Sequence, residues 1–349
     1  MGLAMSTSSH SGAAPAGDSL NVDLSAVIVA VTGDEPKVLA MHSDDPEVPD
    51  ALPSGRLESQ HRTLEAGLRS WVERQTGHTL GYVEQLYTFG DSNRIEAGAR
   101  LAASRERAQS RAQFRVLSIG YLALVREARP GRTAAAAIDV VWRDWYRYFP
   151  WEDWRGGKPA AMARIEQTFK RWVAAAPQRE EKRLREERVR IAFGHRDLAW
   201  SDERVLERYE LLYEVGLVPE AHRDRGDGPA PWAAASDAVT EGETMLADHR
   251  RVLATAIARL RGKIKYRPVV FELMPPSFRF LQLQRAVEAL AGLSLHKSNF
   301  RRLVESQGLV EETGEVEAGT GGRPARLLRF RREVRMDRPV PGLRLPLAR

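Results

Sequence analysis

The stretch LSLHKSNFRRLVESQGLV, residues 293–310, has the pattern of a short amphipathic helix with a crowded polar face. Phe300, Leu303 and Val304 recur at helical spacing and predict the buried side. Polar side chains lie on the opposite face or flank it near the helix start: Lys297, Ser298, Asn299, Arg301 and Arg302. Because one charge would keep such a helix in solution, we expect this face to bind a partner.

The segments on either side of this helix complete a recognisable order of elements. A second amphipathic helix precedes it and ends at Gly292, with apolar residues on one side: Phe280, Leu283, Val287 and Leu290. Downstream lie an apolar strand (309–313), a glycine-rich tip (314–322) and a second strand (323–331). Helix, turn, basic helix and hairpin is the order of a winged helix-turn-helix, whose second helix enters the DNA major groove.

The polar face carries side chains that suit the edges of DNA bases. Arg301 and Arg302 match guanine or phosphate, and Asn299 matches adenine. Arg323 and Arg326, where the hairpin returns, are placed to meet backbone phosphates or the minor groove. Together with Lys297 and Ser298, these residues are the predicted DNA-binding surface.

The distribution of charge favours the same interpretation. The chain of 349 residues has a net charge of +6, and between residues 323 and 338 seven arginines stand against two acids, Glu333 and Asp337. A basic surplus at one end suits a polyanionic partner. The alternatives are a solvated basic face and a structural adaptor, because winged helices also bind proteins.

Composition excludes several classes of site. The chain has no cysteine, so disulfides and thiolate metal sites are ruled out. No apolar run reaches the roughly 18 residues that span a bilayer, so we expect a cytoplasmic protein without membrane contact. The histidines lack zinc-ligand spacing, and no P-loop or GxSxG motif is present, so we expect no metal and no catalytic residue from these classes.

The N-terminal third has the pattern of a mixed α/β domain. Two apolar runs, 24–33 and 37–43, flank a turn and predict a hairpin. Segments 81–91 and 114–127 have the β-branched and aromatic content of strands, and residues 62–77 have helical spacing that ends at Gly77. With the later helical patterns, these segments divide the chain into a disordered leader (1–21), a sensor domain (22–131), a helical insertion (132–242), a connecting helix (243–266), the winged helix-turn-helix (267–338) and a tail (339–349).

The segment LPSGRLESQHRTLEAGLRSWVERQTG, residues 52–77, resembles the Nudix box, in which glutamates on one helix face bind the Mg²⁺ that activates water. With Gly77 as the closing glycine, the three metal-binding positions hold Trp71, Arg74 and Gln75, and Arg62 replaces the earlier glutamate. The neighbouring register recovers only Glu73 among the glutamates. The pattern therefore predicts a Nudix-like domain that is not an enzyme.

Further segments carry a family resemblance: QLYTFGD (85–91), DHRRVLATAIARLRGKIKYRPVVFEL (248–273), HKSNFRRLVESQGLVEETGE (296–315) and GGRPARLLRF (321–330). With the altered box, they resemble the Nudix-related transcriptional regulators, the NrtR group and the longer NadQ-type proteins. The resemblance implies an α+β multidomain fold, a degenerate Nudix α/β/α sandwich with a helical insertion followed by a winged helix-turn-helix. It also implies a dimeric, nucleoid-associated bacterial repressor of NAD biosynthesis or salvage genes that binds palindromic operator DNA.

The implied effector is an adenine nucleotide in the Nudix-like pocket: ADP-ribose, NAD or ATP. Arg56 and Arg62, in or beside the former metal loop, and Arg115, at the start of a strand, are the candidates to meet its phosphates. A cluster of tryptophans (142, 145, 151 and 154) suits either stacking on adenine or, as we prefer, a buried core. The alternative function is an active Nudix hydrolase with an interaction module, using carboxylates from Glu58, Glu65 and Glu73.

Overall fold

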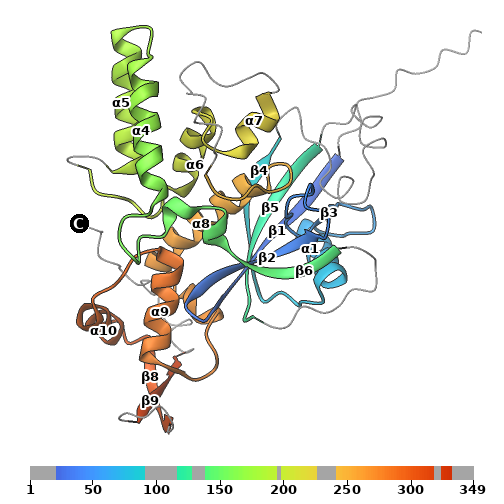
Figure 1. The fold of residues 1–349 in the computed structure, drawn as a ribbon. Helices are drawn as coiled ribbons and strands as arrows, with labels where there is room; N and C mark the ends of the chain where they lie inside the picture. Colours follow the sequence, from blue (N-terminus) through green and yellow to red (C-terminus); the bar gives the residue numbers. More distant parts are fainter. Residues whose placement is uncertain are drawn as a thin grey trace, which may run out of the picture.

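The protein is described by a computed structural model over residues 21–90, 116–127, 138–194, 198–225, 241–317 and 324–331. In these ranges the chain forms one main sheet, helices on both of its faces and a smaller three-stranded sheet near the C-terminal end (Figure 1). Residues 1–20 of the predicted leader, the predicted tail, and the candidates Arg115 and Arg323 lie outside the described residues, whereas Asn21, the last residue of the predicted leader, is described.

The main sheet is mixed and is built around the predicted hairpin. β1 (Asn21–Thr32) and β2 (Glu35–Ser43) pair in antiparallel fashion across a tight turn, where Gly33 and Asp34 have φ values of 60° and 70°. β5 (Val116–Leu124) runs parallel to β1, and β4 (Tyr82–Phe89) pairs with it antiparallel at the edge. The strand order is β4-β5-β1-β2-β6, with the short β3 (Ser54–Arg56) paired to β1.

Both faces of this sheet are buried, because β1 and β5 are apolar on both sides. Leu24, Ala26, Ile28 and Ala30 pack with Leu68 and Val72 of α1 (Leu64–Thr76). Val27 and Val29 pack on the other face with residues of α8 (His249–Tyr266). Alternate strand residues point to opposite faces, so a run without polar interruption requires a layer on each side. The predicted α/β/α sandwich is confirmed.

The boundary between the predicted sensor domain and the predicted helical insertion differs from the one that the sequence suggested. Residues 138–144, which we assigned to the helical insertion, form β6 (Ile138–Asp144), paired with β2 as an edge strand of the main sheet. Val140, Val141 and Trp142 are β-branched or aromatic and suit a strand. The density of tryptophans just after this strand led us to place the start of the insertion too early in the sequence.

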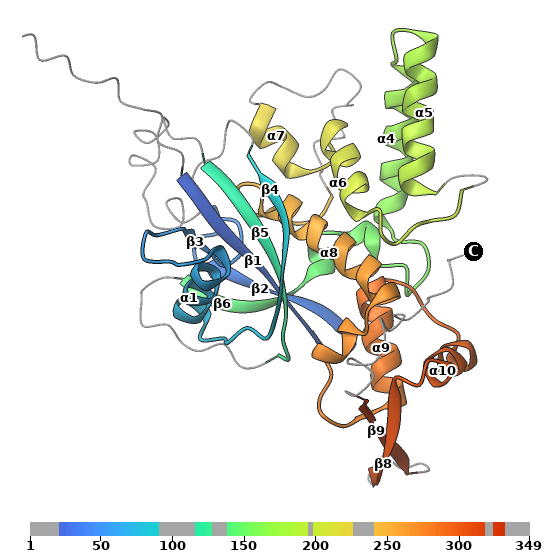
Figure 2. The same ribbon diagram turned by 180° about the vertical axis from the view of Figure 1, so that it is seen from behind.

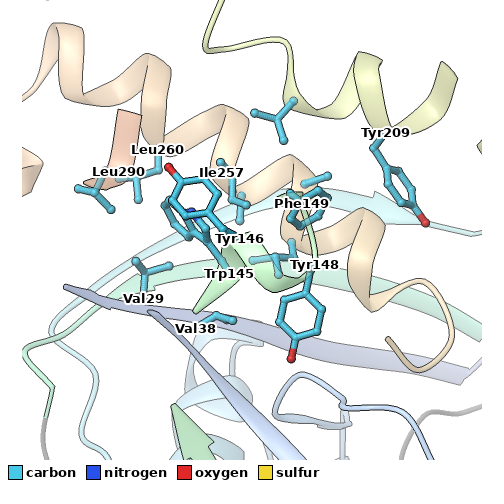
Figure 3. Close-up of a cluster of buried hydrophobic side chains, with 14 of the residues drawn as sticks. Val29, Val38, Trp145, Tyr146, Tyr148, Phe149, Tyr209, Ile257, Leu260 and Leu290 are labelled. Atoms are coloured by element: carbon cyan, nitrogen blue, oxygen red, sulfur yellow. The ribbon is translucent and has the colours of Figure 1, made fainter. Parts of the chain in front are cut away.

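The helical segment then begins with two short 3₁₀ turns, η1 (Trp145–Arg147) and η2 (Pro150–Glu152). α4 (Ala161–Ala174) and α5 (Arg179–Phe193) form a hairpin that projects from the body, followed by α6 (Val205–Glu214) and α7 (Pro219–Arg225) (Figure 1). Of the four clustered tryptophans, Trp145 and Trp151 are fully buried in the core, part of which Figure 3 shows around Trp145. Trp142 and Trp154 are only half-buried and pack at the edge of a core, so the preferred interpretation holds for two of the four.

The predicted connecting helix has different surroundings from those expected. α8 begins at His249 and packs against β1, β4 and β5 on one side and α6 on the other. Even its charged residues Arg250 and Arg261 are 0% and 1% exposed. α8 is therefore a layer of the sandwich rather than a linker between domains.

The winged helix-turn-helix has the predicted element order. After η4 (Val269–Glu272), a two-residue strand β7 (Phe278–Arg279) leads into α9 (Phe280–Ala291) and α10 (Lys297–Ser306). β8 (Val310–Glu317) and β9 (Ala325–Phe330) form the wing, with β7 paired to β9. Figure 2 shows this unit at one end of the molecule, attached through α9.

Of the described helices, none is both long and apolar enough to cross a membrane.

Candidate nucleic-acid interface

The exposed face of α10 is the candidate interface. Phe300 is 3% exposed and Val304 fully buried, with Phe300 packed edge-on against Phe280 of α9 at a centroid distance of 5.5 Å. The helix therefore docks through the apolar side that the sequence indicated. All five predicted contact residues on it are exposed: Lys297, Ser298, Asn299, Arg301 and Arg302.

The basic residues of α10 differ in how far they are neutralised. Arg301 donates to Glu305 one turn later, with an Nε–Oε1 distance of 2.8 Å, and its guanidinium lies 5.7 Å from the centre of the Phe280 ring. For Lys297 and Arg302, no acidic partner is found among the described residues. These two therefore carry the unpaired positive charge of the helix.

The arginines of the wing are paired with glutamates on the neighbouring strand. Arg326 is exposed, as predicted, but donates to Glu312 at 2.6 Å, and Arg329 donates to Glu311 at 2.6 Å. Arg279 similarly meets Glu317 at 2.5 Å. The described part of the wing is thus less positive than its arginine content suggested, because β8 places a carboxylate opposite these cations.

The altered Nudix box forms a closed contact between α1 and β3. Thr63 caps the helix by accepting from the N–H of Ala66, and Gly77 ends it in the left-handed region at φ 69°. Trp71 donates to the carbonyl of Arg56 at 2.7 Å, and Gln75 donates to the carbonyl of Ser54 at 2.8 Å.

The indole of Trp71 also determines which residue faces it. A Cβ on Gly55 would come within 2.1 Å of the indole, so glycine is required there. Arg74 stacks over the same ring at 4.2 Å. Two of the three positions that hold metal ligands in the Nudix pattern therefore bind the β3 backbone instead, and the third covers the indole.

The remaining carboxylates of the box do not form a cluster. Glu65 pairs with Arg69 at 2.8 Å, Glu58 lies near His61, and Glu73 is exposed. Within the described ranges, no three His, Asp or Glu side chains gather as a metal site would require. The candidate phosphate-binding residues Arg56 and Arg62 are both exposed, one at the end of β3 and the other just before α1.

A buried charged group that was not predicted from the sequence joins the helical segment to α8. Glu152 of η2 accepts from Arg208 of α6 at 2.5 and 2.8 Å and from Arg261 of α8 at 2.5 Å. These three residues are each no more than 1% exposed. The available signal was Arg261 on the apolar side of a predicted helix, where an unpaired charge would be costly.

Comparison with known proteins supports the assignment of the C-terminal domain. The profile of the NrtR DNA-binding winged helix domain matches residues 270–330. The ADPR responsive transcriptional repressor NtrR of Acinetobacter baylyi is 42% identical over 83 residues, which cover 24% of this chain and 33% of the relative. The matching region thus spans about a third of that relative's length.

Two solved structures are similar over most of the chain. NrtR of Shewanella oneidensis in complex with a 27mer DNA is 18% identical, with a TM-score of 0.48, over 89% of this chain and 93% of that one. A MutT/nudix family protein from Enterococcus faecalis is 14% identical, with a TM-score of 0.47, over 92% and 90%. The fold assignment itself follows from the strand order, the two helical layers and the wing of this chain. Residues 270–330 thus form a winged helix domain that matches the NrtR DNA-binding winged helix family, and this domain is joined to a Nudix-like α/β/α sandwich.

Proposed function

We propose that this protein is a nucleotide-responsive transcriptional repressor that binds operators of NAD biosynthesis or salvage genes as a cytoplasmic homodimer. The observation that carries the proposal is the exposed face of α10, where Lys297, Ser298, Asn299 and Arg302 stand free of the packing that buries Phe300. A helix with this face, in a domain of the NrtR DNA-binding family, suits entry into the major groove.

The Nudix-like domain is proposed to sense a nucleotide without hydrolysing it. Support comes from Trp71 and Gln75, which bind the β3 backbone at positions where the Nudix pattern has metal-binding glutamates. Arg56, Arg62 and Arg115 are the proposed phosphate contacts. The matched Acinetobacter relative is a repressor responsive to ADP-ribose, which makes that nucleotide the first effector to test, before NAD and ATP.

A mobility-shift assay with and without nucleotide tests this function. We expect the purified protein to retard DNA from promoters of NAD genes at physiological salt, and ADP-ribose to change the operator affinity several-fold. The physical reason is a coupling free energy between the two sites, typically about 1–3 kcal/mol. Absence of sequence-selective retardation would refute the repressor function.

Calorimetry provides the reciprocal control. Because coupling acts equally in both directions, operator DNA must change the nucleotide affinity by the same factor. Equal nucleotide affinity with and without saturating operator would exclude control of DNA binding by that nucleotide.

Incubation with Mg²⁺ tests the alternative function. The nucleotide should be recovered intact, whereas turnover that depends on Glu73 would favour a hydrolase. Sedimentation of the protein alone tests the dimer.

Because the arginines of the wing are paired with glutamates, we expect that removing one of these glutamates strengthens DNA binding. Glu312→Gln leaves Arg326 without its carboxylate partner and removes one negative charge from the exposed surface of the wing. We expect tighter binding to operator and non-specific DNA alike, with the slope of log Kd against log salt steeper by about one unit. Glu214→Gln, which removes a similar exposed partner of Arg188 far from the wing, is the matched control. Unchanged affinity and slope in Glu312→Gln would mean that Arg326 does not approach DNA.

A further inference from the structure

The C-terminal end of α9, directly before the turn that leads to α10, is capped by groups from outside the winged helix. The last carbonyls of a helix have no partner within it and need donors from elsewhere. Here the Tyr146 hydroxyl of η1 donates to the carbonyl of Ala289 at 2.7 Å, and Arg261 of α8 donates to that of Leu290 at 2.9 Å. The N–H of Trp154 donates to the carbonyl of Gly292 at 2.8 Å.

One of the capping groups, the guanidinium of Arg261, belongs to the buried charged group. Arg261 also donates to Glu152, which in turn is bound by Arg208 of α6. The positive charge of Arg261 lies at the negative end of the α9 dipole, where a cation is favourable. The groups that cap α9 thus come from α8 and from the start of the helical segment.

The turn itself is fitted closely to this cap. Gly292 has φ 70°, and a Cβ there would lie 2.3 Å from the carbonyl oxygen of Glu152 and 2.8 Å from the Tyr146 hydroxyl. Two residues later, Ser294 donates to the carbonyl of Arg155 at 2.9 Å. The turn between α9 and α10 therefore contacts the helical segment at two positions, Gly292 and Ser294, before α10 begins at Lys297.

The hydroxyl of Tyr146 has the properties of a permanent donor. Burial raises its pKa to about 12, so the proton remains in place throughout the neutral range. In Figure 3 this hydroxyl points toward the side on which Leu290 lies, whereas that of Tyr148 points away from it. Tyr148 donates instead to Asp50 at 2.6 Å, in the sheet domain.

We propose that the start of the helical segment, residues 145–155, together with Arg261, holds the helix-turn-helix at a fixed angle on the body, and that Tyr146 is a positioning residue for DNA recognition. This inference rests on the proposed function. It assigns the helical segment a mechanical role: α10 is preorganised, so less conformational freedom is lost when it enters the groove. A change in that angle is expected to affect mainly the contacts with base edges, which carry the sequence selectivity, because phosphate contacts carry no sequence information.

The test compares Tyr146→Phe with Tyr148→Phe. Each change removes one buried hydroxyl from the same short segment, but only the first removes a bond to α9. Tyr146→Phe is expected to weaken operator binding about fivefold, because that is the loss expected from one hydrogen bond. The affinity for non-specific DNA should stay unchanged. Amide hydrogen exchange across residues 292–300 should become faster in this variant. Tyr148→Phe should behave as wild type in both measurements.

The possible results distinguish a loss of the α9 cap from a general loss of stability and from a failure of the proposed function. Equal losses of operator affinity in both variants would overturn the positioning role, because stability alone would then explain them. Wild-type affinity and exchange in Tyr146→Phe would overturn it too. If the unmodified protein binds no operator, the proposed function fails, and faster exchange in Tyr146→Phe alone would still support the cap.

Discussion

Replacing Glu152 by alanine is expected to lower the free energy of unfolding by about 3–5 kcal/mol, the cost of breaking a buried ion pair from one side. The carboxylate is 1% exposed and neutralises two guanidiniums that are themselves buried, Arg208 and Arg261. Without it, two positive charges face each other in the core. Urea denaturation followed by tryptophan fluorescence measures the loss, because Trp151 lies beside Glu152 in the chain and is fully buried.

The comparison is Glu180→Ala, which removes an exposed carboxylate paired with Arg183 at 2.8 Å. An exposed pair of this kind contributes at most about 1 kcal/mol, so this variant should unfold almost as wild type does. A loss in Glu152→Ala no larger than that in Glu180→Ala would show that the buried group does not hold the core together.

The same group predicts a pH dependence. Burial alone would raise the pKa of Glu152, but the charges and hydrogen bonds of Arg208 and Arg261 outweigh it and hold the pKa below its ordinary value. A carboxyl with a lowered folded pKa stabilises the fold above its unfolded pKa and loses that contribution as pH falls through the folded pKa. The stability difference between wild type and Glu152→Ala should therefore narrow as the pH falls below about 4.

Arg302→Ala is expected to weaken operator binding by about 1–3 kcal/mol, roughly 5- to 150-fold, if the guanidinium contacts a base. The side chain is exposed on the opposite side of α10 from Val304, so the fold should be retained. It also has no acidic partner in the described part of the chain, in contrast to Arg301. Fluorescence anisotropy with operator and scrambled duplexes, together with a melting curve, measures both properties.

Arg183→Ala is the control for Arg302, because it also removes an exposed arginine, one that pairs with Glu180 on α5, well away from α10 (Figure 1). It should leave operator affinity unchanged. A collapse of the melting temperature in Arg302→Ala would mean that the residue is structural. An equal loss of affinity for both duplexes would instead assign Arg302 to a phosphate.

Much of the architecture was predictable because its signals are local. The spacing of Phe300 and Val304, the stop at Gly292 and the two short strands of the wing specify the winged helix and its polar face within a few dozen residues. The β1–β2 hairpin and α1 followed from the same kind of pattern. Even the altered Nudix box was readable, because the identities of Trp71, Arg74 and Gln75 do not depend on the fold.

Features decided by long-range contacts were not predictable in this way. The pairing of β6 with β2 joins positions about a hundred residues apart, and the burial of α8 depends on strands from the other end of the chain. The pairing of Arg326 with Glu312 could not be predicted without knowing the register of the two wing strands. Sequence alone thus determined which helix has an exposed basic face, since helical periodicity and residue chemistry are properties of neighbouring residues. Only the tertiary structure decided how that helix is held, because the hydroxyl of Tyr146 meets the carbonyl of Ala289 across 143 positions, a distance at which no local pattern carries information.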